Sequence, residues 1–528
     1  MNKRNYNVFF HLHTVSGIVI SVGLYIIFFA GAFILFEHAI HHWESGKYEE
    51  NKPHTVITKQ FDYDRLFAVL KKEGYDLYGR NVNLSLEGEQ EQGISISGSP
   101  DKNATKEAKK RIRLKLNTST YELSKEGAEK YSFGRLLYLL HFYYQLGKFG
   151  YYISGAVALF FLFAIVTGVV IHWEKIVSNF YLFRPFAKLK TVWTDAHTAL
   201  GTIGLPFQFL YALTGAMFGL GIVVSLSGSL AHGGSTEKFY EVLYGREQDS
   251  LGTKTTAAYS LNQYADSLNN KWEGFEPKYI TIKNCESSTM QFGAYGFLPT
   301  KNQFLSDGEL YYDVATGKIT KEQNPLENGY ANGVWASVYR LHYADYGELG
   351  SWNNFGLKIV YFLLALATCV VIISGVLIWM EARNKKNIPE KEKRYNEDVG
   401  HIYLALCLSM LPITAFTFIV SKLLPETFNA DRETIFNTVY FGGWLLLSIF
   451  FWRKKDNHFT NKYTLLSGAI LGLLIPIVNG IHSGNWIWRT FLNGDRDVFV
   501  IDALWICISA IAFYSLYRIR KKVVLEES

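Results

Sequence analysis

Two histidines occupy the same local pattern in different parts of the chain. His13 opens the stretch HTVSG and His197 opens HTALG, and each stands at the entrance of a long apolar run with a glycine four residues later. Ligating side chains beside a membrane span are costly and mark functional sites. Neutral imidazole is also a common ligand of haem iron. The repeated pattern therefore predicts two haem ligands at the same face of a bilayer.

A second pair of histidines repeats in a similar way. His141 in LLHFYYQLGKFG aligns with His342 in LHYADYGELG, and further on Thr167-Gly168 aligns with Ser374-Gly375. The second copy is longer between the histidine and the glycine, so this alignment needs a gap. Four histidines at matching places predict two ligand pairs, because a haem can be held through both of its axial positions.

The duplication also predicts where the pairs lie. Its unit is a helix, an outer domain and a second helix, and an even number of spans separates the two first helices. Both copies then enter the membrane in the same direction, related by a pseudo-two-fold axis along the membrane normal. The first helices would bring one pair together near the cytoplasmic face, and the second pair would meet near the outer face.

A single histidine at a helix entrance has a plainer interpretation, as an interfacial or capping residue. Because four histidines occupy matching places in the two copies, the sequence favours ligands. His11, His172 and His401 are secondary candidates. His11 aligns with Asp195, and His172 has no symmetric partner. His401 lies in a stretch that resembles a degenerate third copy of the pattern.

The exit from the first apolar run is rich in histidine. His38, His41 and His42 follow that run closely. They are candidates for an outer iron or substrate site, although solvated loop histidines are the plainer interpretation.

The composition is that of a membrane protein with many spans. Of the 528 residues, 49% are hydrophobic and only 19% are charged. Eight apolar runs reach, or nearly reach, the roughly 20 residues that a helix needs to cross a bilayer. They cover residues 14–36, 151–173, 199–229, 355–380, 400–421, 436–452, 464–481 and 499–517.

Lysine and arginine set the expected orientation. They cluster before the first run, between runs two and three, four and five, and six and seven, and after run eight. The positive-inside rule places these segments in the cytoplasm. We therefore expect a multi-pass protein of the bacterial inner membrane with both termini cytoplasmic. This topology accounts for the net charge of +6, so no nucleic-acid surface is expected.

The two long polar segments each predict a small α+β domain. Helical periodicity at 61–75 and at 259–272 is followed by alternating strands. The expected fold is a polytopic α-helical protein of about eight spans with two such extracytoplasmic domains. Its predicted parts are a first span (1–37), a first periplasmic domain (38–138), spans two and three (139–229), a second periplasmic domain (230–338), span four (339–383) and four additional spans (398–520).

Other cofactors are not indicated. The sequence has no G-x-G-x-x-G after a predicted strand, no P-loop and no nucleophile elbow. Flavin or nicotinamide is therefore not expected within this chain, and the electron donor would be a separate molecule. The four cysteines suggest neither a disulfide framework nor a thiolate metal site.

The order of the motifs resembles the PepSY-associated transmembrane family. The resemblance covers residues 8 to about 383, and its most specific part is DAHTALG with ALTG further on; the outer segment ending in YYDVATGKIT is similar to a PepSY domain. Members of that family include inner-membrane reductases that carry haem b and reduce ferric siderophores in the periplasm. The resemblance implies two haem b groups held by His13, His141, His197 and His342.

The sequence thus favours a haem-dependent reductase that moves electrons across the membrane to periplasmic ferric iron or a ferric siderophore. One alternative is a non-enzymatic PepSY membrane protein that binds peptides, restrains a protease or senses the envelope. Another is a transporter of the iron complex, which would need broken helices at mid-membrane, and only Pro206 and Pro412 hint at those.

Overall fold

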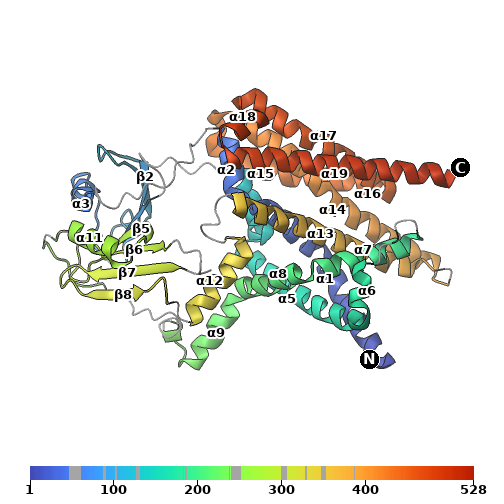
Figure 1. Ribbon diagram of the computed structural model, residues 1–528, viewed down its shortest axis with the longest axis horizontal. Coiled ribbons are helices and arrows are strands. Elements are labelled where there is room, and N and C mark those ends of the chain that lie inside the picture. Colours follow the sequence, from blue (N-terminus) through green and yellow to red (C-terminus); the bar gives the residue numbers. More distant parts are fainter. Residues whose placement is uncertain are drawn as a thin grey trace.

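A bundle of long helices and a separate sheet make up the protein (Figure 1). The computed structural model describes the chain except residues 47–60, 87–90, 102–103, 126–130, 182–183, 185–186, 237, 240–250, 258, 299–305, 328–329, 346–351, 386 and 528. Seven of the described helices are long and apolar enough to cross a membrane, or eight if a bent pair counts as one span. The prediction of a polytopic helical membrane protein is confirmed. Both chain ends lie at the end of the bundle away from the sheet.

The duplicated helices form one closed group. Helix α1 (Lys3–Ile34) packs against α5 (Gly147–His172) and α13 (Trp352–Arg383), while α5 packs against α8 (Leu205–Gly219) and α13 against α7 (Leu189–Ile203). One short helix precedes the second long helix of each copy. These are α4 (Phe133–His141), which contacts α1, and α12 (Tyr330–Tyr343), which contacts α8.

The predicted apolar run 199–229 is divided among several helices rather than forming one continuous helix. Helix α7 ends at Ile203, α8 begins at Leu205, and the two are bent by 71°. A third helix, α9 (Gly221–Ala231), follows. Pro206 explains the bend, because proline has no backbone N–H and its ring excludes the preceding helical turn.

The C-terminal helices pack alongside the duplicated core (Figure 1). Helix α14 (Glu390–Leu423) packs against α16 (Gly443–Lys454) and α17 (Asn457–Ser483), and α17 packs against α19 (Arg496–Glu527). The short helix α2 (Glu37–Ser45) continues from α1 and contacts both α19 and α4. It therefore links the core to the C-terminal helices. Two short helices, α15 (Arg432–Asn437) and α18 (Ile487–Leu492), also belong to the C-terminal part. Another short helix, α6 (Ile176–Tyr181), lies between α5 and α7 in the duplicated core.

The two α+β units share a single antiparallel sheet of eight strands, in the order β4-β3-β2-β1-β5-β6-β7-β8. Strands β1 and β5 join the units, with Val82 opposite Ile282 and Leu84 opposite Ile280. Helices α3 (Tyr63–Lys72) and α11 (Asn262–Lys271) contribute to one common apolar core beneath the sheet. The strands are β1 (Val82–Ser85), β2 (Glu91–Ile96), β3 (Ile112–Asn117), β4 (Leu123–Lys125), β5 (Glu276–Lys283), β6 (Gln291–Phe297), β7 (Asp307–Asp313) and β8 (Ile319–Gln323).

Because the units share a sheet and a core, damage to one should loosen the other. Leu84 is 2% exposed, and Leu84→Ala should destabilise the sheet domain by about 2–5 kcal/mol. Hydrogen exchange of the full-length protein should then increase in β5 and β6 as well as in β1 and β2. The exposed Lys125→Ala in β4 is the control and should change neither unit. An increase confined to the first unit would show that the units unfold separately.

Candidate functional site

The structure brings His13 and His197 together. Their ring centroids lie 6.1 Å apart with an interplanar angle of 70°. His13 comes from α1 and His197 from α7, the corresponding helices of the two copies. Both side chains are partly buried.

A Thr-Gly pair on α5 receives the ring of His13. Its Nδ1 lies 2.8 Å from the backbone oxygen of Ala164, and the Thr167 hydroxyl donates to the same oxygen at 3.0 Å. A Cβ atom placed on Gly168 would lie 3.0 Å from His13 Cε1. The glycine thus makes room for the imidazole.

The second copy repeats this arrangement on α13. Nδ1 of His197 lies 2.9 Å from Val371 O, and the Ser374 hydroxyl donates to the same oxygen at 2.9 Å. A Cβ on Gly375 would lie 3.1 Å from His197 Cε1. A carbonyl oxygen only accepts, so Nδ1 carries the proton in both rings and Nε2 keeps its lone pair for a ligand.

His141 and His342 form a second pair. Their ring centroids are also 6.1 Å apart, with an interplanar angle of 57°. His141 is the last residue of α4, and its Nδ1 lies 2.8 Å from Ile27 O on α1. A Cβ on Gly31 would lie 2.9 Å from both Cε1 and Nδ1 of His141. This ring is therefore held on α1 as His13 is held on α5.

His342 departs from the pattern. Its Nδ1 lies 2.8 Å from the hydroxyl of Thr214 on α8, and that hydroxyl donates to Leu210 O at 2.8 Å. Thr214 therefore accepts from His342, which has the same tautomer as the other three rings. The Tyr211 hydroxyl also donates to the backbone oxygen of His342 at 2.8 Å. Sequence reasoning did not identify Thr214, although a hydroxyl beside the glycine of ALTG was the available signal.

The two pairs lie toward opposite ends of α1. His13 stands near the start of this helix, and Ile27, which binds His141, stands 14 residues later. At 1.5 Å per residue the two levels are about 21 Å apart along the helix axis, compared with about 30 Å for a hydrocarbon core.

An apolar pocket surrounds the pair formed by His141 and His342. Beside His141 and His342 it is lined by aromatic residues, among them Tyr138, Phe142, Tyr151, Phe218 and Tyr343. Helices α4 and α12 lie outside the candidate spans. Burial, with a smaller contribution from the charge of His141, lowers the pKa of His342 to about 3. Burial also lowers the pKa of His141. Both imidazoles are therefore neutral at pH 7, as ligation requires.

The secondary candidates are placed differently. His11 is exposed on α1. His172, the last residue of α5, lies close enough to His13 and His197 to interact with them electrostatically. His401 belongs to the C-terminal helices, where its Nδ1 lies 2.7 Å from Asn457 Oδ1. Only His172 is near a histidine pair.

The histidines that follow the first span lie on α2. Nδ1 of His38 and Nδ1 of His42 are each 3.3 Å from Asp497 Oδ2 on α19, and His42 is buried. His41 is exposed. The described residues contain no group of three or more His, Cys, Asp or Glu side chains that could hold a metal ion.

The fold and the site define a polytopic helical membrane protein with an α+β sheet domain and two pairs of facing histidines. The family model of the PepSY-associated TM region matches residues 10–382, which is more than half of the chain, and the protein belongs to this family. The matched part contains both histidine pairs. Helices α14 to α19 lie beyond it.

A similar protein is found in Pseudomonas aeruginosa. It is 22% identical over 266 residues, which are 49% of this chain and 65% of that protein. The match therefore covers less than two thirds of the relative, which is itself uncharacterized.

The contact between Gly31 and His141 can be tested in the isolated protein. In Gly31→Ala the new methyl group must displace a buried, hydrogen-bonded ring, so we expect a loss of about 1–3 kcal/mol of stability. The matched control is Gly356→Ala in α13, where a Cβ meets nothing within 4 Å. There alanine should stabilise the helix by about 0.5–1 kcal/mol. Thermal unfolding in detergent measures both, and equal midpoints for the two variants would contradict the contact.

Proposed function

We propose that the protein binds two haem b groups, one between His13 and His197 and one between His141 and His342, and that it carries electrons across the membrane. The observation that supports this most directly is the equal spacing of both ring pairs, 6.1 Å between centroids. A bound metal lies about 2 Å from an imidazole nitrogen, and the ring centre lies about 1 Å further back, so two axial ligands place their centroids about 6 Å apart.

Two further features fit a flat macrocycle. Each Nδ1 is occupied by an acceptor on a neighbouring segment, which leaves Nε2 as the ligand atom and fixes the tautomer. Space is also open beside the inner pair: a Cβ on Gly17 meets nothing within 4 Å, and one on Gly201 meets only Val371, at 4.0 Å. Both glycines stand one helical turn after their histidine.

When held by these two histidine pairs, the haem groups would supply reversible one-electron chemistry at iron. The chain would do the rest. Its backbone carbonyls orient the imidazoles, its aromatic pocket excludes water from the outer pair, and its helices hold the two pairs at fixed heights. No general acid or base is assigned to this reaction.

The electron acceptor that we propose is ferric iron or a ferric siderophore on the side of the sheet domain, in the periplasm of a bacterium. The donor would be a separate molecule on the cytoplasmic side. The distribution of lysine and arginine supports this orientation, and both chain ends lie opposite the sheet (Figure 1).

Optical spectroscopy tests the proposal. The purified protein should show a strong Soret band, sharp α-bands on reduction, and about two haem b per chain. The reduced protein should be reoxidised when a ferric chelate is added. A colourless protein that is fully inserted in the membrane would contradict the proposal and favour the non-enzymatic alternative, in which the outer domain binds peptides, restrains a protease or senses the envelope.

Single substitutions test the ligand assignment. Because one lost axial ligand weakens one centre, His197→Leu should leave about one haem per chain and preserve the outer pair, and His342→Leu should do the reverse. His401→Leu, in the C-terminal helices, is the control and should keep both haem groups. Retention of two haem groups in both ligand variants would remove these residues as ligands.

A further inference from the structure

A buried ion pair joins the C-terminal helices to the duplicated core. Glu44 lies at the end of α2 and Arg432 at the start of α15, and Arg432 Nη2 is 3.2 Å from Glu44 Oε2. The side chains are 4% and 8% exposed, respectively. The Arg432 guanidinium also lies over the ring of Phe436, 4.9 Å from its centroid.

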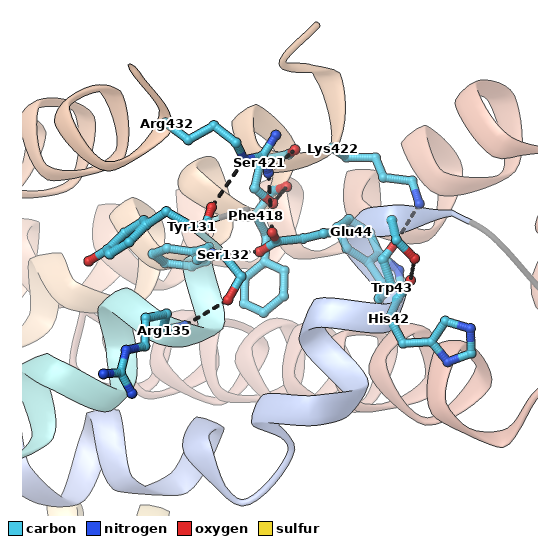
Figure 2. A network of polar contacts seen from close by, with 12 residues as sticks. His42, Trp43, Glu44, Tyr131, Ser132, Arg135, Phe418, Ser421, Lys422 and Arg432 are labelled. Atoms are coloured by element: carbon cyan, nitrogen blue, oxygen red, sulfur yellow. Dashed lines mark hydrogen bonds and ion pairs between the residues drawn. The ribbon is translucent and has the colours of Figure 1, made fainter. Parts of the chain in front are cut away.

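Both members of this pair bind the start of α4. Glu44 Oε1 accepts from the backbone N–H of Phe133, the first residue of α4, at 2.7 Å. Arg432 Nε donates to Tyr131 O at 3.0 Å, and its Nη2 donates to Ser421 O on α14 at 3.4 Å. Figure 2 shows the pair between these segments. The carboxylate thus satisfies a free N–H at a helix N-terminus, where negative charge is also favourable.

Apolar packing holds the same end of α4. The ring of Phe133 is fully buried and lies 5.2 Å from that of Phe418 on α14 and 5.7 Å from that of Tyr440, just before α16. The Ser132 hydroxyl caps α4 by accepting from the N–H of Arg135 at 3.0 Å. The N-terminal end of α4 therefore rests on helices outside the duplication.

The other end of α4 is His141. Helix α4 has nine residues, so its length is about 14 Å and the start and the end move as one rigid piece. The His141 ring is in close contact with Gly31 and hydrogen-bonded to Ile27 O, so it has no room to shift freely. A shift at the start of α4 is therefore transmitted to His141.

We propose that Glu44 and Arg432 are positioning residues for His141, and that the C-terminal helices serve to hold the outer histidine pair in its geometry. The identity of His141 as a haem ligand rests on the proposed function above, whereas the contacts of Glu44 and Arg432 with α4 do not. Neither Glu44 nor Arg432 touches the histidine rings. They act through α4.

Electrostatics makes the pair sensitive to the loss of Arg432, because the Glu44 carboxyl must then either stay charged and unpaired or take up a proton. Burial raises the pKa of Glu44 to about 7, and the charges of Arg432 and, more weakly, Lys422 oppose that rise. Lys422 itself donates to the backbone oxygen of Trp43, the residue before Glu44 (Figure 2). Removing one member of a buried pair therefore disturbs the site more than removing both.

The test compares Arg432→Gln with the wild-type protein at pH 8, which lies above the pKa of Glu44 in the wild-type protein. Hydrogen exchange of residues 134–141 should become about tenfold faster, while exchange in the middle of α5 stays unchanged. In the haem-loaded protein, the midpoint potential and the low-spin signal of the outer haem should change and those of the inner haem should not. Lys71→Gln is the control, because it breaks an ion pair with Glu286 in the sheet domain, and it should leave α4 and both haem signals unchanged.

Two further variants separate positioning from general damage. Glu44→Gln retains an oxygen for the Phe133 N–H and should loosen α4 less than Arg432→Gln does. The double variant Glu44→Gln/Arg432→Gln should recover part of the protection of α4. Unchanged exchange in α4, or equal acceleration in α4 and α5 in all three variants, would overturn the inference. A wild-type protein without haem would overturn the proposed function alone, because hydrogen exchange in α4 would still measure how firmly Glu44 and Arg432 hold this helix.

Discussion

The core of this protein depends on one kind of hydrogen bond, from an imidazole Nδ1 to an acceptor on a neighbouring helix. In an apolar interior an unpaired N–H costs several kcal/mol, so each ring must find an acceptor. The bonds join α1 to α5, α7 to α13, α4 to α1 and α12 to α8. The interaction that selects the tautomer therefore also sets the helices at matching heights, and it leaves the second nitrogen of every ring directed elsewhere.

The sequence allowed the four histidines to be paired, because duplication leaves a visible trace in residue types and spacing. It did not allow the acceptors to be named. Three of them are backbone oxygens, which every residue has, and the fourth is the hydroxyl of Thr214, which has no counterpart in the first copy, where Ala30 stands before Gly31. The role of Gly168 and Gly375 likewise became clear only when each was seen against an imidazole ring.

Contacts between distant segments account for most of what could not be predicted. The pattern of alternating residues gave the strands, but the pairing of β1 with β5 joins parts of the chain separated by a membrane hairpin. Glu44 and Arg432 are single charges in polar stretches, and only their burial side by side at the start of α4 distinguishes them. Pro206 was a signal for the bend before α8, but the hydropathy of the run stays high across the bend and does not indicate it.

The junction between β1 and β5 has a consequence for how the protein is made. In the proposed orientation strand β1 is synthesised and exported early, but its partner at residues 276–283 follows only after two more membrane crossings. Until then the nascent domain has an open strand edge, which is a template for wrong pairing with other chains. Assembly of the sheet domain must therefore wait for insertion of the helices between its halves, and a stalled insertion would leave an aggregation-prone half sheet.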